Sequence, residues 1–215
     1  MKSVLILGAG NFGSMLARQM NAQGYEIMIV DLREALINAV MPYVTDAQIG
    51  DCTNPAFLQS LGVDNYDLCV VSMCEIFQTS LEATSMLKEL GAKRVISRAK
   101  NEVQEKFLLR NGADEVVYPE KQIALRLATK YASEKILDFI QFDGGYSIYE
   151  MAVPDEWEGK TLPQLDVRRK YDVNLISLRR GSTVTIPRPD DPFQKGDVVY
   201  AVGEMKKLYR CFHLR

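Results

Sequence analysis

The sequence predicts an α/β fold in which a Rossmann-like, doubly wound parallel sheet is followed by a crossover helix and a small α+β C-terminal module. The apolar run at residues 3–7 leads directly into the glycine pattern G-A-G-N-F-G at residues 8–13. Short apolar segments then alternate with amphipathic ones up to residue 118, which is the pattern of βαβ units. Beyond Gly144-Gly145 the chain changes to short alternating segments separated by turn residues, which indicates a separate module.

The glycine pattern is the first candidate binding site. Between a strand and a helix, such a turn cradles a diphosphate, because Gly8 makes the tight turn, Gly10 leaves room for the phosphate and Gly13 lets the helix pack on the strand. The phosphate then lies at a helix N-terminus, whose unpaired N–H groups carry a partial positive charge. Asn11 and Phe12 belong to the same candidate site. A glycine-rich turn without a ligand is the alternative, but the flanking strand and helix favour phosphate.

The other elements of the first domain follow in order. We expect a helix over residues 14–23 that ends at Gly24, and a strand over residues 26–30 that ends at Asp31. Further strands are expected at 47–49, 66–72, 94–97 and 115–118, and further helices at 33–40, after Thr53 or Asn54 with Pro55 in the first turn, at 77–90 and at 102–111.

Asp31 lies 18 positions beyond Gly13, close to the spacing of roughly 20 expected for the carboxylate that binds the ribose hydroxyls of NAD. The alternative role is the N-cap of the helix over residues 33–40. The two roles are compatible, and the spacing favours the ribose. A carboxylate here repels a 2′-phosphate and disfavours NADP, although Arg33 nearby leaves that preference open. Leu32 and Arg33 are included in the candidate site.

From Pro119 to about Ile140 the apolar spacing predicts one amphipathic helix. Its apolar positions suit either packing on its own sheet or a dimer face, and the pattern does not separate the two. Beyond it we expect strands at 146–153, 173–178, 183–186 and 198–202 and a closing helix. The predicted organisation is a nucleotide-binding domain at 1–119, a crossover helix at 120–143 that also suits a dimer face, and a small β-rich C-terminal module at 144–215.

Composition and charge exclude several classes of protein. A net charge of −2 without long runs of one sign predicts no broad electrostatic binding of nucleic acid or of anionic membranes. No apolar stretch approaches the roughly 20 residues of a membrane span, and the first apolar run has no signal-peptide cleavage site. We therefore expect a cytoplasmic protein. Its cysteines form no C-x-x-C motif, so reduced thiols are expected rather than a zinc site. They are Cys52, Cys69, Cys74 and Cys211.

The predicted nucleotide site has no evident reactive partner. A dehydrogenase needs an acid or base beside the nicotinamide, yet the sole histidine, His213, belongs to the closing module. There is no Tyr-x-x-x-Lys pair in the first domain, where Tyr66 is followed four residues on by Val70. G-x-S-x-G, Walker A and H-E-x-x-H motifs are absent as well. We therefore expect binding without turnover; the alternative is a small NAD-dependent oxidoreductase whose acid or base comes from a partner chain.

Several motifs occur together and in a fixed order along the chain. They are G-A-G-N-F-G at 8–13, Asp31, G-D-C-T at 50–53 and Y-P-E-K at 118–121, followed by G-K-T-L at 159–162, R-R-K-Y at 168–171, P-R-P-D-D at 187–191 and Gly196-Asp197. In these motifs the sequence resembles the RCK (also called KTN) domain family over essentially its whole length. One N-module followed by one C-module is most similar to the cytosolic regulatory subunit of Ktr/Trk-type bacterial potassium uptake systems.

The resemblance implies a non-enzymatic, nucleotide-sensing subunit. Such subunits form dimers that build a ring, commonly an octamer, docked beneath a membrane potassium channel at the inner face of the cell membrane. The identity of the bound adenine nucleotide, NAD(H), ADP or ATP, would change the dimer hinge and thereby the pore. A regulator of another transporter would share the fold and stays an alternative.

The resemblance also assigns residues by position. Asp31 matches the acid on the ribose, Asp51 and Cys52 match residues around the adenine, and Arg98 matches a basic position near the phosphates. Ser72, at the end of the fourth strand, is included in the nucleotide site.

Glu120 matches an acid that in some members helps to hold a divalent cation between two subunits. The alternative is a first-turn glutamate that the helix dipole favours. In some relatives the C-module binds a cyclic dinucleotide at its dimer interface. Arg168 and Arg169 are suitable donors for it, with a solvated helix face as the alternative.

Asn11 departs from the family pattern, because ATP-responsive members often carry an arginine there that reaches the terminal phosphate. Asparagine donates a neutral hydrogen bond, which is about half as strong as one from a charged group. We therefore hypothesise a preference for a dinucleotide or ADP, or another source of positive charge in the site.

Overall fold

The computed structural model describes residues 2–73, 75–142 and 145–214. The chain divides into two compact units, Met1–Glu120 and Lys121–Arg215. Cys74 and Gly144, which the sequence analysis singled out, lie outside the described residues.

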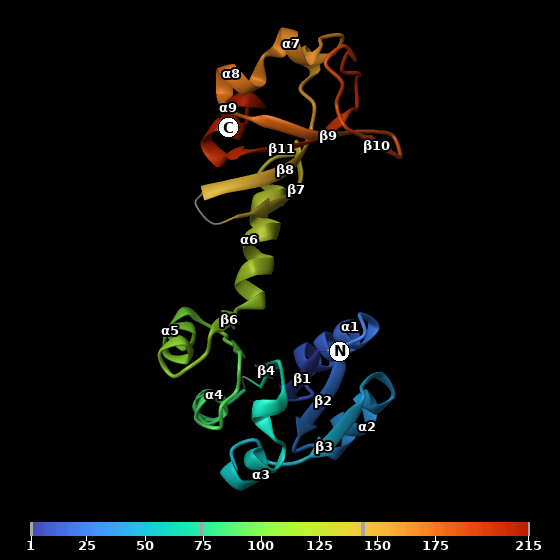
Figure 1. Cartoon of the computed structure of the whole chain (residues 1–215). Helices are drawn as coiled ribbons and strands as arrows, with labels where there is room; N and C mark the ends of the chain where they lie inside the picture. Colours follow the sequence, from blue (N-terminus) through green and yellow to red (C-terminus); the bar gives the residue numbers. More distant parts are fainter. Residues whose placement is uncertain (1, 74, 143–144, 215) are drawn as a thin grey trace. The chain divides into compact units, whose positions relative to one another are not determined.

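The first unit is built on a six-stranded parallel sheet with the strand order β3-β2-β1-β4-β5-β6 (Figure 1). Its strands are β1 (Ser3–Leu7), β2 (Glu26–Asp31), β3 (Asp46–Ile49), β4 (Leu68–Val71), β5 (Val95–Arg98) and β6 (Glu115–Val117). Its helices are α1 (Asn11–Ala22), α2 (Glu34–Val40), α3 (Pro55–Ser60), α4 (Phe77–Glu89) and α5 (Glu102–Arg110), with 3-10 turns at Met41–Tyr43 and Val63–Asn65. The chain builds outward from β1 in one direction and then returns to the other side of β1 with β4. This reversal creates a crevice at the carboxyl ends of β1 and β4, where ligands of such sheets bind.

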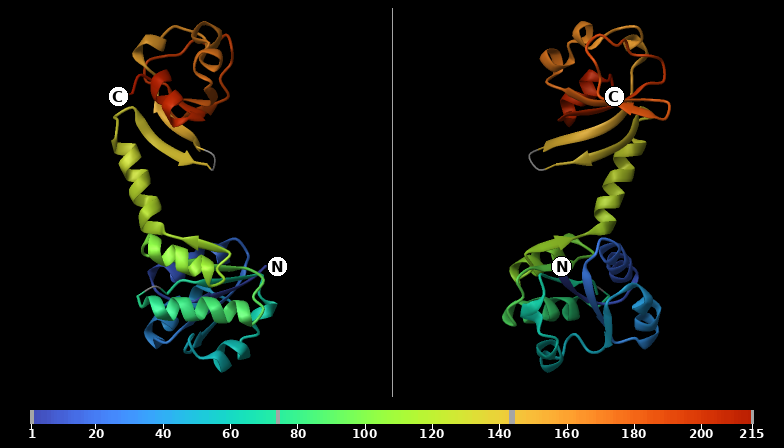
Figure 2. Two further views of the ribbon diagram at one scale, coloured as in Figure 1. Left: turned by 90° about the vertical axis from the view of Figure 1, so that its left-hand side faces the viewer. Right: turned by 45° about the vertical axis from the view of Figure 1, so that its right-hand side comes forward.

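The central strand β1 sends side chains to both faces of the sheet. Leu5 and Leu7 pack in one buried cluster, and Val4 and Ile6 pack in the other. Helices α1 and α2 cover the face of Val4, whereas α3 and α4 cover the opposite face (Figure 2). Because both faces are covered, β1 and β4 are nearly continuous apolar runs, as the sequence predicted.

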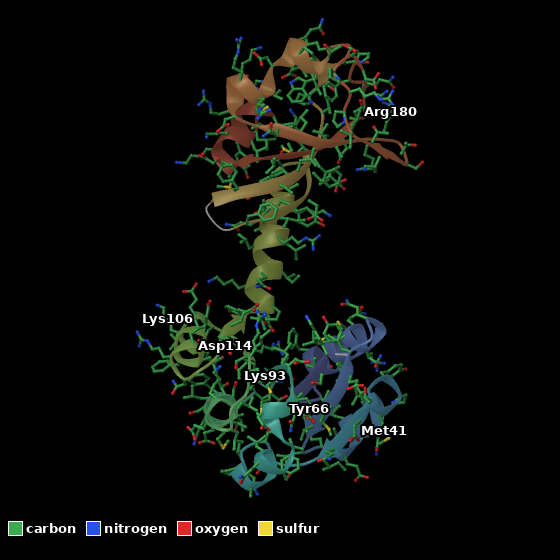
Figure 3. The ribbon with its side chains drawn as sticks, in the orientation of Figure 1. Met41, Tyr66, Lys93, Lys106, Asp114 and Arg180 are labelled. Carbon is green, nitrogen blue, oxygen red and sulfur yellow. The ribbon has the colours of Figure 1, made fainter. Side chains whose placement is uncertain are left out.

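Asp114 joins helix α4 to the strands β5 and β6. Its carboxylate accepts hydrogen bonds from Nζ of Lys88 on α4, at 2.9 Å, and from the backbone N–H of Val95 on β5, at 2.7 Å. Asp114 itself directly precedes β6 (Figure 3). These bonds tie α4 and β5 to the residue that directly precedes β6.

The second unit holds a five-stranded antiparallel sheet with the order β10-β9-β11-β8-β7. Its strands are β7 (Ile136–Gln141), β8 (Tyr146–Ala152), β9 (Asn174–Arg180), β10 (Thr183–Thr185) and β11 (Val198–Glu204). Its helices are α6 (Pro119–Tyr131), which begins at the boundary of the units, α7 (Leu162–Leu165), α8 (Val167–Tyr171) and α9 (Met205–Cys211), with a 3-10 turn at Asp155–Trp157. The Rossmann-like domain followed by a small α+β module is thus confirmed.

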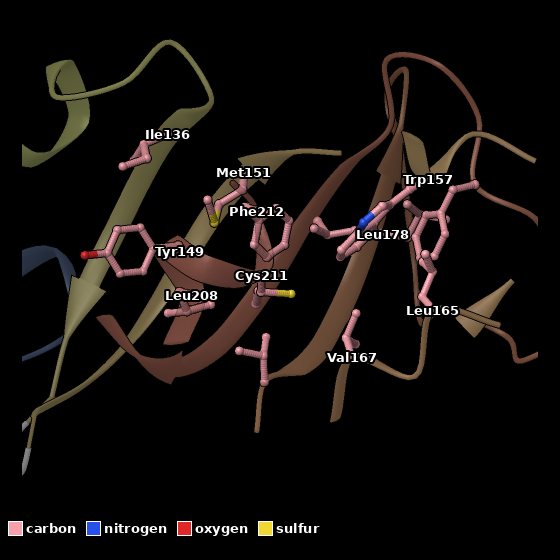
Figure 4. Close-up of a cluster of buried hydrophobic side chains, with 14 of the residues drawn as sticks. Ile136, Tyr149, Met151, Trp157, Leu165, Val167, Leu178, Leu208, Cys211 and Phe212 are labelled. Carbon is pink, nitrogen blue, oxygen red and sulfur yellow. The ribbon is translucent and has the colours of Figure 1, made fainter. Parts of the chain in front are cut away.

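Aromatic and aliphatic side chains together fill the core of this second unit (Figure 4). Trp157 contacts Phe212, with ring centroids 5.0 Å apart, and Phe193 at 5.6 Å. Tyr149 stacks on Phe139 at 5.4 Å. The module therefore has a hydrophobic core of its own.

The prediction of one helix from Pro119 to Ile140 is wrong in its second half. Helix α6 ends at Tyr131, and Ile136–Gln141 forms β7, which pairs antiparallel with β8. The apolar spacing in 136–140 fits a helix, but Ile136 and Phe139 become buried in the core by strand pairing. None of the residues of α6 itself is buried in this single chain.

The described cysteines, Cys52, Cys69 and Cys211, are buried free thiols. Among the described helices, none combines the length and the apolar character that a membrane span requires.

Candidate functional site

The glycine loop lies between β1 and α1 and is held by hydrogen bonds to its neighbours. The N–H of Gly8, a residue with φ of +107°, donates to the carbonyl of Val30 at 2.7 Å. Ser72 Oγ lies 2.6 Å from the carbonyl oxygen of Gly8, and Ser14 Oγ donates to that of Ala9 at 2.6 Å. Ser72 therefore lies at the predicted site, with its hydroxyl bound to the loop.

Two glycines of the motif, Gly10 before helix α1 and Gly13 in its first turn, have different roles. A Cβ on Gly13 would lie 2.0 Å from the carbonyl oxygen of Gly8 and 2.5 Å from Ser72 Oγ. Gly13 therefore allows α1 to pack against the loop, as the sequence predicted. A Cβ on Gly10 would meet no atom within 4 Å. Gly10 is the N-cap of α1 and contributes no side-chain hydrogen bond, so it leaves an open approach to the helix N-terminus.

Asp31 ends β2 and is 6% exposed. Its Oδ2 accepts the N–H of Ala9 in the glycine loop at 2.8 Å, and its Oδ1 accepts the N–H of Arg33 at 2.9 Å. The Arg33 side chain also donates to both oxygens, through Nε at 3.0 Å and Nη2 at 3.2 Å. Burial alone would raise the pKa of Asp31, but the hydrogen bonds from Arg33 and Ala9 outweigh it and lower the pKa. The carboxylate is ionised at neutral pH.

The alternative helix-capping role of Asp31 is only partly seen. The N-cap of α2 is Arg33, which makes no side-chain capping bond, and Asp31 reaches just the N–H of that residue. The second predicted cap is confirmed, since Asn54 Oδ1 accepts the N–H groups of Ala56 and Phe57.

Asp51 and Cys52 follow β3 at the same edge of the sheet. Hydrogen bonds from the Thr53 hydroxyl and N–H lower the pKa of Asp51. Burial, with a contribution from the charges of Asp31 and Asp51, raises the pKa of Cys52 to about 12. Cys52 is therefore a neutral thiol at physiological pH and is not a nucleophile.

These segments enclose a cleft of about 470 Å³ at the carboxyl ends of the strands, a volume typical of small-molecule sites. The cleft is lined by Gly8, Gly10, Asn11, Phe12, Asp31, Leu32, Arg33, Gly50, Asp51, Cys52, Ser72, Met73, Glu75, Ile76, Thr79, Arg98 and Lys100. The structure thus brings the predicted nucleotide-site residues together around one cavity. Gly13 lies beneath the loop, and Glu120 lies outside the lining.

The end of the cleft beside β5, its far end, carries positive charge. Arg98, at the end of β5, places its guanidinium 5.3 Å from the centre of the Phe12 ring, within range of a cation–π contact. It also pairs with Glu120, in the first turn of α6. Arg98 Nε is buried without a hydrogen-bond partner among the described side chains and backbone. One N–H donor of its guanidinium is therefore left without a partner in the described part of the chain.

Sequence reasoning missed several lining residues, of which Lys100 is the most consequential. It lies two positions beyond the end of β5 and adds a second cation beside Arg98. The signal that could have found it is the basic pair that follows a strand of the sheet, since loops after the strands line this crevice. Glu75 and Thr79, near the start of α4, were missed because no motif marks them.

The remaining predicted ligand residues lie elsewhere. Glu120 is paired with Arg98, and a hydrogen bond from its own backbone N–H, together with this pairing, lowers the pKa of Glu120. No group of three His, Cys, Asp or Glu side chains suited to a metal occurs within residues 2–73, 75–142 and 145–214. Arg168 and Arg169 lie on α8 in the second unit, where Arg169 pairs with Asp166 at 2.8 Å.

Comparison with known proteins identifies the family. The TrkA-N domain matches residues 4–119, and the TrkA-C domain matches residues 148–211. The chain belongs to the TrkA-N/TrkA-C family. The resemblance seen in the sequence motifs is confirmed.

Members of this family with curated names are similar over nearly their whole length. The Ktr system potassium uptake protein C of Bacillus subtilis is 31% identical over 210 residues, which cover 97% of this chain and 95% of that protein. The Ktr system potassium uptake protein A of the same organism is 29% identical with the same coverage.

A solved structure, the GsuK RCK domain, aligns with a TM-score of 0.69 at 17% identity, over 99% of this chain and 47% of that one. The chain thus spans about half the length of that structure, and the likeness establishes the fold.

Proposed function

We propose that this TrkA-N/TrkA-C protein is a regulatory subunit of a potassium uptake system and that it senses an adenine nucleotide without turning it over. The observation that carries the proposal is the cleft itself. It combines an open helix N-terminus, the buried carboxylate of Asp31 at the end of β2 and three cationic side chains, those of Arg33, Arg98 and Lys100. Among the described residues that line the cleft there is no histidine and no tyrosine, and the thiol of Cys52 is not ionised. These are groups that bind and orient a ligand.

Each part of an adenine nucleotide has a matching part of the cleft. The diphosphate would lie against Gly10 and the N-terminus of α1, and the ribose hydroxyls would donate to Asp31. Asp51 and Cys52 lie next to Asp31 and would border the adenine. A solved relative in fold is named as the GsuK channel bound to NAD, with a TM-score of 0.67 and 17% identity. This name agrees with a nucleotide in the cleft of the present chain.

The charge of the cleft bears on the choice among NAD(H), ADP and ATP. Asn11 provides no cation at the helix N-terminus, so Arg98 and Lys100 are the positive groups of the far end. Arg98 is already shared with Glu120. We propose that ADP and the dinucleotides, with fewer phosphate charges than ATP, bind more tightly than ATP.

Assembly and partners follow from the family. We propose that the chain forms dimers that build a cytoplasmic ring, an octamer, on the inner face of a Ktr/Trk-type membrane potassium channel subunit. A divalent cation at Glu120 would need further ligands from a second chain and would compete with Arg98 for the carboxylate. A cyclic dinucleotide at Arg168 and Arg169 of the C-terminal module is a separate proposal that rests on the family resemblance.

Calorimetric titration with ATP, ADP, NAD and NADH tests the nucleotide site directly. We expect binding of ADP or a dinucleotide, and no consumption of NADH with a panel of small carbonyl substrates. Asp31→Ala removes the ribose acceptor and should weaken binding at least tenfold, as expected for a lost buried charge-assisted contact. Asp64→Asn, an exposed carboxylate of the same unit, is the matched control. Tightest binding of ATP contradicts the charge argument, and steady NADH oxidation contradicts the sensor.

Potassium flux tests the regulatory role. The protein should co-purify with a membrane potassium channel subunit, and the flux through that subunit in vesicles should change on addition of nucleotide. Asp31→Ala should keep the complex but lose the nucleotide response. A flux that is unaffected by the protein and its nucleotides would exclude the proposed regulation.

A further inference from the structure

The ribose end of the cleft is occupied by a side chain of the protein itself. An ionised carboxylate offers about four acceptor positions. In Asp31 these positions hold the N–H groups of Ala9 and Arg33 and the Nε and Nη2 of the Arg33 side chain. A ribose diol that approaches Asp31 therefore finds its acceptors filled.

The four donors differ in how readily they can leave. The two N–H groups belong to the backbone at the glycine loop and at the start of α2, and they can stay while a ligand binds. The guanidinium stands on a flexible side chain that is 54% exposed. Only the Arg33 side chain can therefore give way to ribose hydroxyls without a change in the backbone.

A second acceptor for Arg33 lies within the same cleft. Arg33 Nη1 is 3.7 Å from Oε1 of Glu75, which precedes α4 and is 80% exposed. A small rotation of the arginine side chain would strengthen this contact as the bonds to Asp31 break. The guanidinium then keeps a carboxylate partner in both states.

We infer that Arg33 is an internal competitor for the ribose hydroxyls: it binds Asp31 in the free protein and moves to Glu75 when a nucleotide binds. Arg33 thereby lowers the affinity of the site for every nucleotide with free 2′- and 3′-hydroxyls. It also links occupancy of the ribose site to the segment that leads into α4. This inference rests on the proposed nucleotide site and adds a residue that tunes it.

The test compares ADP with 2′,3′-dideoxy-ADP by calorimetry, in the wild type and in Arg33→Ala. Arg33→Ala should bind ADP about five- to tenfold more tightly, because the hydroxyls no longer displace a charge-assisted pair. Its affinity for dideoxy-ADP should change by less than about twofold, because that ligand does not compete for Asp31. Arg110→Ala, which removes an exposed arginine at the end of α5, should change neither affinity.

Two further variants test the alternative partner. Glu75→Gln should weaken ADP binding about two- to threefold in the wild type and should have no effect in Arg33→Ala, because the two residues act through one contact. Arg33→Lys keeps the charge but loses the two-pronged contact with Asp31, and its ADP affinity should lie between those of the wild type and Arg33→Ala. An undiminished effect of Glu75→Gln in the Arg33→Ala background overturns the proposed movement.

The other outcomes separate this inference from the proposed function. Weaker ADP binding by Arg33→Ala, or equal gains for ADP and dideoxy-ADP, overturns the competition while leaving the nucleotide site intact. NADP binding that is tighter than NAD binding and is lost in Arg33→Ala makes the arginine a 2′-phosphate ligand and also overturns it. If neither wild type nor Arg33→Ala binds any of these nucleotides, the nucleotide site itself is wrong.

Discussion

Gly10 caps helix α1 and Gly13 lies in its first turn, three residues further on, and the same substitution should affect them in different ways. In Gly13→Ala the new methyl group would lie 2.0 Å from the carbonyl oxygen of Gly8, a backbone atom, and 2.5 Å from Ser72 Oγ. The start of α1 must then move away from the loop. Such overpacking costs about 3 kcal/mol or more, a large part of the stability of a domain.

Gly10→Ala is the matched control for stability. Gly10 has φ of −65° and a Cβ there meets no atom within 4 Å, so alanine fits without strain. The loss of a glycine N-cap and the smaller entropy of the unfolded chain nearly cancel, which leaves a change within about 1 kcal/mol. The methyl group would instead lie where the diphosphate approaches the helix N-terminus, and nucleotide affinity should fall at least about tenfold.

Scanning calorimetry and circular dichroism measure the two stabilities, and titration with ADP measures binding. The melting temperature of the first unit should fall by roughly 10 °C in Gly13→Ala and by little in Gly10→Ala. Equal stabilities of the two variants would refute the packing argument. Unchanged ADP affinity in Gly10→Ala would refute the placement of the phosphate.

Two further predictions concern stability. Asp197 is 1% exposed and accepts hydrogen bonds from Arg180 (Figure 3) at 2.8 Å and from the N–H of Gln194 at 2.8 Å. Burial alone would raise the pKa of Asp197, but these bonds lower it. The contribution of Asp197 to the free energy of unfolding is therefore fully present above the pKa of the unfolded state, about 4, and is lost as the pH falls through the lower pKa of the folded state. Asp197→Asn should cost about 3 kcal/mol at neutral pH and progressively less in acid. Urea unfolding followed by the emission of Trp157, the sole tryptophan, reports this in the second unit; a pH-independent difference would contradict the linkage. Asn54→Ala removes the cap of α3 and should lower the free energy of unfolding by about 1 kcal/mol, whereas Asn54→Asp should keep most of the stability that the cap provides. Equal losses in both variants, measured by calorimetry, would exclude capping as the reason.

Local patterns predicted the first unit well because its signals are short-range. The strand before Gly8, the helix stop at Gly24 and the cap at Asn54 each depend on neighbours within a few residues. The second half of the predicted crossover helix was wrong for the opposite reason. Ile136 and Ile140 have helical spacing, but their pairing with Met151 and Ile148 of β8 outweighs that local preference.

The candidate site likewise has some features that local sequence predicts and others that depend on the tertiary structure. Sequence spacing alone placed Asp31 near the glycine loop, because the length of a βαβ unit fixes that distance. It could not show that Lys100 joins the cleft, or that Arg33 fills the acceptors of Asp31 and faces Glu75. Arg33, Glu75 and Lys100 follow the strands β2, β4 and β5, and they line one cleft only once those strands are aligned in the sheet. The sequence by itself thus determined the fold class and the glycine loop, since both are encoded by adjacent residues. Only the tertiary structure decided which charges share the cleft, because that depends on the order of the strands.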